Sequence, residues 1–147
     1  MGAAPSIHAS CVAIAGAGVL IRGPSGSGKS SLAARLILDP PRVLPEAELV
    51  ADDRVVLTVR DGRVLAAPAA ALAGLLEVRH LGIRRLPFLP SCPISLVVDL
   101  AAPDAERLPQ EAAQTTHVAG ISLCRIALGV GADAALVIAA ALKTRIF

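Results

Sequence analysis

The residues most clearly suited to chemistry lie in one short stretch, which reads GPSGSGKSS. Gly23, Gly28, Lys29 and Ser30 meet the spacing G-x-x-x-x-G-K-[ST]. Glycines let the chain curl so that several backbone N–H groups point at one anion, while the lysine adds a positive charge and the hydroxyl can ligate Mg²⁺. We therefore expect a nucleotide-phosphate or pyrophosphate loop made of Gly23, Pro24, Ser25, Gly26, Ser27, Gly28, Lys29, Ser30 and Ser31.

The segments around this loop predict the elements that hold it. An apolar strand-like run, AGVLIRG, precedes it, and KSSLAARLIL follows with helical spacing of leucines. A strand, a glycine loop and a helix N-terminus together favour anion binding. Residues 8–22 predict an antiparallel hairpin with a turn near Gly16, in which partner numbers sum to about 33, so that His8 faces Ser25. A second turn is expected at Asp61–Gly62.

The length and the strand-like and helical runs indicate one α/β domain, and the composition narrows the possible partners. The chain has 147 residues and a net charge of +2 without a lysine-rich run, which argues against nucleic acid. No apolar run reaches the roughly 18 residues that cross a bilayer, so we expect a cytoplasmic protein without a membrane partner. The three cysteines form no metal-binding or disulfide pattern, and buried thiols are expected at Cys11, Cys92 and Cys124.

Aromatic residues are nearly absent, since the chain has two Phe and no Trp or Tyr. A nucleotide base therefore has little to stack on, and most binding energy is expected from the phosphates. This predicts weak discrimination between nucleotides and allows pyrophosphate as an alternative donor to ATP.

Phosphoryl transfer needs carboxylates to hold a metal ion or to take the acceptor's proton. Asp52 and Asp53 follow an apolar strand-like run, and side chains alternate along a strand, so only one of the two is expected to face the site. Asp99, after SLVV, and Glu77, after LL, are further candidates. The residues alone leave the three positions unranked.

Four motifs in a fixed order, HAS, GPSGSGKSS, LVADDRV and LEVRHLGI, resemble those of HPr kinase/phosphorylase. That family phosphorylates a serine of HPr, the phosphocarrier protein of the bacterial sugar phosphotransferase system. The resemblance runs from His8 to about Ile83 and continues weakly through ERLP. It implies a catalytic domain over residues 1–147, with a P-loop inside a mixed sheet of the phosphoenolpyruvate carboxykinase-like type. It also implies ATP, Mg²⁺, an HPr-type partner and a homo-oligomer.

The resemblance also implies a role for each matching residue. Asp53 would be the general base toward the acceptor serine, and Glu77 with Ser30 would hold the metal. His8 and Arg107 would be catalytic, Arg107 by its place in the ERLP segment. Lys29 would neutralise charge that develops on the phosphates.

Three departures from the family pattern bear on function. Little chain precedes His8, so we expect a short form without the usual N-terminal domain. His80 replaces the first glycine of EVRGLGI, and ALGVGAD stands where the family has PVRPGR. Because that segment has lost its basic residues, we expect the reverse phosphorylase activity to be weak or absent.

The sequence thus predicts an ATP-dependent protein-serine kinase acting on HPr. Two alternatives stay open: a kinase for a small metabolite on the same scaffold, and a non-catalytic nucleotide sensor that regulates a partner. The sensor needs only the loop, so the presence of His8, Asp53 and Glu77 beside it favours an enzyme.

Overall fold

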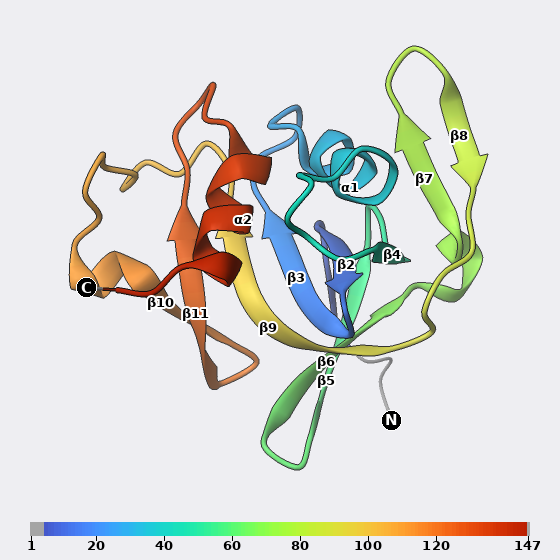
Figure 1. The fold of residues 1–147 in the computed structure, drawn as a ribbon. Helices are drawn as coiled ribbons and strands as arrows, with labels where there is room; N and C mark the ends of the chain where they lie inside the picture. The colour runs from blue at the N-terminus through green and yellow to red at the C-terminus, as the bar shows by residue number, and fades with distance from the viewer. Residues whose placement is uncertain (1–4, 147) are drawn as a thin grey trace.

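The computed structural model describes residues 5–146, so residues 1–4 and Phe147 of the predicted domain lie outside the described part. Strands predominate over helices (Figure 1). In chain order the elements are β1 (Ser6–Ile7), β2 (Ser10–Ile14), β3 (Ala17–Arg22), α1 (Lys29–Leu38), β4 (Ala47–Ala51), β5 (Val55–Arg60), β6 (Arg63–Pro68), η1 (Ala70–Leu72), β7 (Leu75–Val78), β8 (Gly82–Arg85), β9 (Cys92–Asp99), η2 (Glu111–Gln114), β10 (Thr115–Val118), β11 (Ile121–Ala127) and α2 (Ala134–Lys143).

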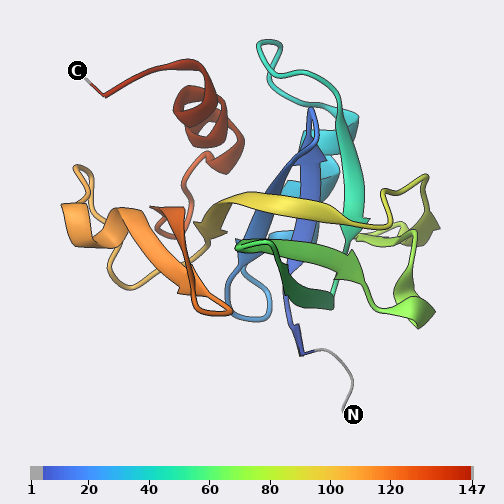
Figure 2. The same cartoon turned by 90° about the horizontal axis from the view of Figure 1, so that it is seen from below.

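The strands form one mixed sheet with a branch at β9, and β7 and β8 form a separate hairpin. Along its main path the order is β1-β5-β6-β9-β3-β2-β4. The start of β9 pairs with β6, while its later residues pair in parallel with both β3 and β11. The β5–β6 pair therefore curls away from the central strands, as the view from below shows (Figure 2). The result is the mixed α/β class expected from the sequence.

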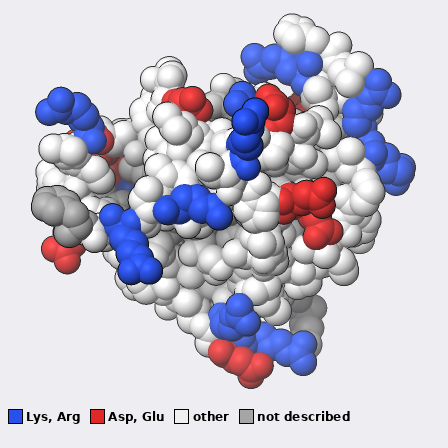
Figure 3. Space-filling view, in the orientation of Figure 1, with Lys and Arg blue, Asp and Glu red and all other residues white. Residues whose placement is uncertain are grey.

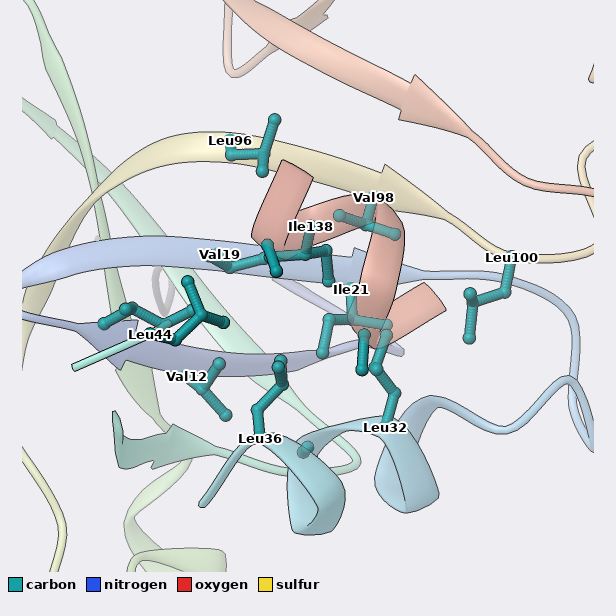
Figure 4. Close-up of a cluster of buried hydrophobic side chains, with 14 of the residues drawn as sticks. Val12, Val19, Ile21, Leu32, Leu36, Leu44, Leu96, Val98, Leu100 and Ile138 are labelled. Atoms are coloured by element: carbon teal, nitrogen blue, oxygen red, sulfur yellow. The ribbon is translucent and has the colours of Figure 1, made fainter. Parts of the chain in front are cut away.

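Two apolar layers hold the sheet, because successive side chains of its strands point to opposite faces. One layer joins Val12, Ile21 and Val98 to the helices through Leu36 of α1 and Ile138 of α2 (Figure 4). The other layer fills the space between the central strands and the curled β5–β6 pair, with small residues such as Ala13 and Ala66. Both helices thus cover one face, and α1 is fixed directly after β3.

The predicted β2–β3 hairpin forms, but with a different register. Val12 pairs with Val19, and Ile14 pairs with Ala17. The turn is a tight two-residue one in which Ala15 has φ 50° and Gly16 has φ 83°, both in the left-handed region. The expectation that His8 faces Ser25 across the ladder is therefore wrong, because the turn is shorter than assumed and β2 begins only at Ser10.

Other local expectations have mixed outcomes. Helix α1 forms as predicted, and the turn at Asp61–Gly62 joins β5 to β6 with positive φ at both residues. Cys11 and Cys92 are buried, but Cys124 is exposed, because β11 is covered less completely than the central strands. In the described part of the chain, no helix has the length and apolar character needed to cross a membrane.

Candidate active site

A cavity of about 610 Å³ brings together most of the residues singled out from the sequence. Its walls come from the glycine loop (residues 23–31), the end of β4, the β7–β8 hairpin and His8. The predicted site residues that line it are His8, Ser25, Gly26, Gly28, Lys29, Ser30, Ser31, Asp53 and Glu77. A volume of this size suits a small-molecule ligand.

The glycine loop presents an open helix N-terminus to this cavity. Gly28 caps α1 with φ 100° and offers no side chain to the first-turn N–H groups, which leaves them available to an anion. Lys29 is buried, and its Nζ donates hydrogen bonds to the carbonyl oxygens of Gly23 at 2.8 Å and Pro24 at 3.1 Å. The ammonium therefore lies inside the curl of the loop.

Asp52 lies beneath the cavity as the centre of a hydrogen-bond network. Its carboxylate accepts from Ser10 Oγ at 2.6 Å, from Ser30 Oγ at 2.8 and 2.9 Å, and from the backbone N–H of Glu77 at 3.2 Å. The side chain is almost fully buried, and these donors satisfy it. Asp52 thus joins β2, α1, the end of β4 and β7 at one point.

Asp53 lies at the rim of the same cavity. Its φ is 68°, and the N–H of Arg54 donates to the carbonyl of Asp52 at 2.8 Å, so Asp53 is the centre of a positive-φ γ-turn. His8 Nε2 lies 3.1 Å from Asp53 Oδ1, and both side chains are solvent-accessible. An imidazole beside an accessible carboxylate is an arrangement suited to proton transfer.

Both aspartates line the cavity, contrary to the expectation that only one would. Neighbouring side chains alternate between the two faces only where the strand continues. The strand ends at Ala51, and the γ-turn redirects Asp53 to the side that Asp52 already faces.

The β7–β8 hairpin supplies Glu77 and His80 from the opposite wall. Glu77 pairs with Ile83 in the ladder and its side chain is exposed. The N–H of Leu81 donates to the carbonyl of Val78 at 3.0 Å, and His80 has φ 72°. His80 therefore occupies the third position of a type II turn, where glycine is favoured. Basic side chains gather over this hairpin in Figure 3.

Asp99 has a different environment from the other candidates. Arg22 and Arg125 bind its two carboxylate oxygens at 2.6 to 2.8 Å, and Arg125 also pairs with Asp104. Burial opposes ionisation, but the hydrogen bonds and charges of the two arginines outweigh it and hold the pKa of Asp99 below its ordinary value. Asp99 thus fixes β3, β9 and β11 together just before the glycine loop.

Arg107 is exposed on the segment between β9 and η2. Among the described residues that line the cavity, it is not present. The structure therefore does not bring this predicted residue together with the others.

The donors that meet here suit a hard cation. Ser30, Asp52 and Glu77 offer oxygen ligands, and Mg²⁺ commonly takes one or two protein carboxylates together with substrate phosphates. Within residues 5–146, no cluster of three or more His, Cys, Asp or Glu side chains is preformed around a metal position. An ion held here would therefore need phosphate oxygens as further ligands beside those of the protein.

Comparison with known proteins identifies the family. A family model described as the HPr Serine kinase C-terminal domain matches residues 1–146. The chain belongs to this family. The HPr kinase/phosphorylase of Limosilactobacillus reuteri is 41% identical over 103 residues, which are 65% of this chain and 30% of that protein. The enzyme of Streptococcus thermophilus is 46% identical over 79 residues, which are 53% of this chain and 24% of that protein.

The fold of this HPr kinase C-terminal domain is also similar to a solved structure. The Hpr(Ser) kinase/phosphatase of Coxiella burnetii superposes with a TM-score of 0.75 at 23% identity, covering 95% of this chain and 88% of that one. The curled mixed sheet with two helices is therefore that of the family. The matched segments span less than a third of the curated relatives.

Sequence reasoning missed the place of Asp52 in the domain. Alternation along the strand predicted that one aspartate of the pair would face the site, but not that the other would accept a hydrogen bond from Ser30. Ser10 lies on β2, Ser30 on α1 and Asp52 directly after β4. These elements meet only in the folded domain, so the spacing of the three residues along the chain did not indicate the network.

Proposed function

We propose that this domain transfers the γ-phosphoryl group of ATP to a serine of an HPr-type phosphocarrier protein. The observation that carries the proposal is the convergence of the glycine loop, Asp52, the His8–Asp53 pair and Glu77 on one cavity. A binding module would need the loop alone. A base at the rim and a carboxylate network under the loop support phosphoryl transfer.

Each residue has a distinct part in this mechanism. The N–H groups of the glycine loop and Lys29 bind the phosphates and neutralise their charge. Asp53 accepts the proton of the serine hydroxyl, and His8 beside it orients the carboxylate. Ser30, Asp52 and Glu77 are the residues that would hold Mg²⁺, and the ion would supply positive charge to the reacting phosphates.

The acceptor serine enters from the side of the cavity on which His8 and Asp53 lie. Their side chains are 44% and 63% exposed, whereas the residue Asp52 is only 4% exposed. A serine on the surface of another protein can therefore reach Asp53 without opening the fold. The buried Asp52 holds the loop and metal side instead.

We further propose that phosphorolysis of phosphoserine by this domain is weak. Residues 127–133, ALGVGAD, contain no basic side chain that could bind inorganic phosphate beside the glycine loop. A homo-oligomer remains part of the proposal because the family resemblance implies it, and a cytoplasmic location remains part of it because no apolar run reaches the length that crosses a bilayer.

Incubating the protein with HPr, Mg²⁺ and ATP, and locating new phosphate by mass spectrometry, tests this function. We expect one phosphoserine on HPr. Transfer to small metabolites with none to HPr would favour a metabolite kinase, and ATP binding without any transfer would favour a sensor.

A further inference from the structure

A second, smaller cavity lies on the other side of the glycine loop. It has a volume of about 260 Å³, less than most whole-ligand pockets. One wall is Pro24–Ser27 of the loop, and the other comes from Leu100 after β9 and from residues 128–132 between β11 and α2. In Figure 1 the connection from β11 to α2 rises at the same end of the sheet as the glycine loop.

The two cavities meet at the glycine loop, because Ser25 and Gly26 line both. An anion held by the loop N–H groups therefore has one cavity on each side. The larger one contains every carboxylate and imidazole of the proposed reaction. A nucleotide whose reacting phosphate faces those groups must direct its other end elsewhere.

The linings of the two cavities differ in chemistry. None of the residues that line the smaller cavity carries a charge, and its polar side chains are those of Ser25 and Ser27. Leu100 and Leu128 line it and are buried. Val130 is 92% exposed on its wall, an apolar side chain left in solvent beside an apolar hollow. Such a lining suits the flat face of a heterocycle and not a phosphate.

Ser27 adds a second observation at this place. Its Oγ is buried and has no hydrogen-bond partner among the described residues. A buried hydroxyl without a partner is unfavourable, so the ligand-free loop retains an unused donor and acceptor next to the smaller cavity.

We infer that the smaller cavity binds the base of the nucleotide whose phosphates the glycine loop holds. This inference rests on the proposed function, since it requires phosphate binding at the loop. The base packs on aliphatic side chains, with Val130 covering one of its faces. Because the lining offers few side-chain hydrogen bonds, adenine and guanine nucleotides bind with similar affinity, and inorganic tripolyphosphate leaves the cavity empty.

Val130 is the residue to change, since its exposure makes its replacement harmless to the fold. Val130→Ser removes apolar contact with the base and weakens ATP binding about three- to tenfold. Val130→Phe adds an aromatic face and strengthens ATP binding by a similar factor. Both variants bind tripolyphosphate as the parent does. Val43→Ser is the matched control, because Val43 is also exposed, at 58%, and lines neither cavity.

Photolabelling with 8-azido-ATP, followed by peptide mapping, locates the base directly. Label on residues 128–132 supports the inference. Label on the β7–β8 hairpin overturns it, as do equal ATP affinities for the two Val130 variants and the parent. Neither result contradicts the proposed phosphoryl transfer to HPr. A parent protein that binds neither ATP nor tripolyphosphate overturns the proposed function itself, and this inference with it.

Discussion

Ser30 Oγ donates its hydrogen bond to the carboxylate of Asp52, at 2.8 Å from Oδ1 and 2.9 Å from Oδ2. This contact joins the first turn of α1 to the end of β4. The same carboxylate also accepts from Ser10 Oγ on β2, at 2.6 Å from Oδ1. The position of the glycine loop relative to the sheet therefore depends on one buried charge.

Asp52→Asn should damage both stability and catalysis. Asparagine keeps one accepting oxygen, and its amide nitrogen only donates, so it cannot satisfy all three donors, and we expect the free energy of unfolding to fall by about 1–3 kcal/mol. Phosphoryl transfer should fall at least about 100-fold, because Ser30 and Glu77 are no longer held in position by the carboxylate. Urea titrations and ATP-dependent phosphorylation of HPr measure the two effects.

Ser10→Ala is the matched control for this network. It removes one hydrogen bond from the same carboxylate, but Ser10 does not line the cavity. We expect a loss of about 1 kcal/mol in stability with transfer within a few-fold of the parent. Were Asp52→Asn to behave like Ser10→Ala, the carboxylate would have only a structural role.

His80→Gly should stabilise the domain. His80 has φ 72° at a turn position that glycine adopts freely, so the substitution relieves strain of about 1 kcal/mol. Arg79 is the neighbouring turn residue and is not among the described residues with positive φ. Arg79→Gly should lower stability, because glycine relieves no strain there and raises the conformational entropy of the unfolded chain. Thermal unfolding of the two variants should shift in opposite directions, and a lower melting temperature for His80→Gly would contradict this account of the turn.

Asp99 should govern stability in acid. Its folded-state pKa is lowered by Arg22 and Arg125, so its contribution is complete above the unfolded pKa near 3.9 and is lost as the pH falls through the lower folded value. Asp99→Asn should cost stability at pH 7 and flatten the decline of stability below pH 4. Urea midpoints at pH 7 and pH 3 compare the two proteins. Parallel declines would mean that another group is responsible.

Chelation of divalent metal should separate activity from folding. The Asp52 carboxylate already accepts hydrogen bonds from Ser10, Ser30 and the N–H of Glu77. We therefore expect the nucleotide-free domain to fold without a bound metal ion. With excess EDTA we expect no phosphoserine on HPr and an unchanged melting temperature without nucleotide. A melting temperature that falls with EDTA would show a metal built into the folded domain.

The sequence predicted the parts of the site that depend on local rules. The spacing from Gly23 to Ser30 predicted the loop and the start of α1, and Asp61–Gly62 predicted a tight turn, because these features need only a few consecutive residues. The mixed α/β class followed from the same local patterns.

Features that depend on distant parts of the chain were not predictable in this way. The γ-turn at Asp53 interrupts a run that local alternation treats as a strand, and the partner of Ser30 is chosen by how β4 meets α1. From its place at a strand end, Asp99 was a candidate metal ligand. In the folded sheet, however, Arg22 of β3 and Arg125 of β11 bind its carboxylate. The branch of the sheet at β9 likewise arises from pairing between remote strands.

In the proposed reaction, Asp53 takes the proton of the acceptor serine. The most direct test is the initial rate of HPr phosphorylation by Asp53→Asn, with Asp61→Asn as control. Both aspartates have positive φ, which asparagine tolerates, but Asp61 lies in the β5–β6 turn and does not line the cavity. We expect a fall of at least about 100-fold for Asp53→Asn with ATP affinity within a few-fold of the parent, and no change for Asp61→Asn. Transfer by Asp53→Asn at the parental rate would contradict it.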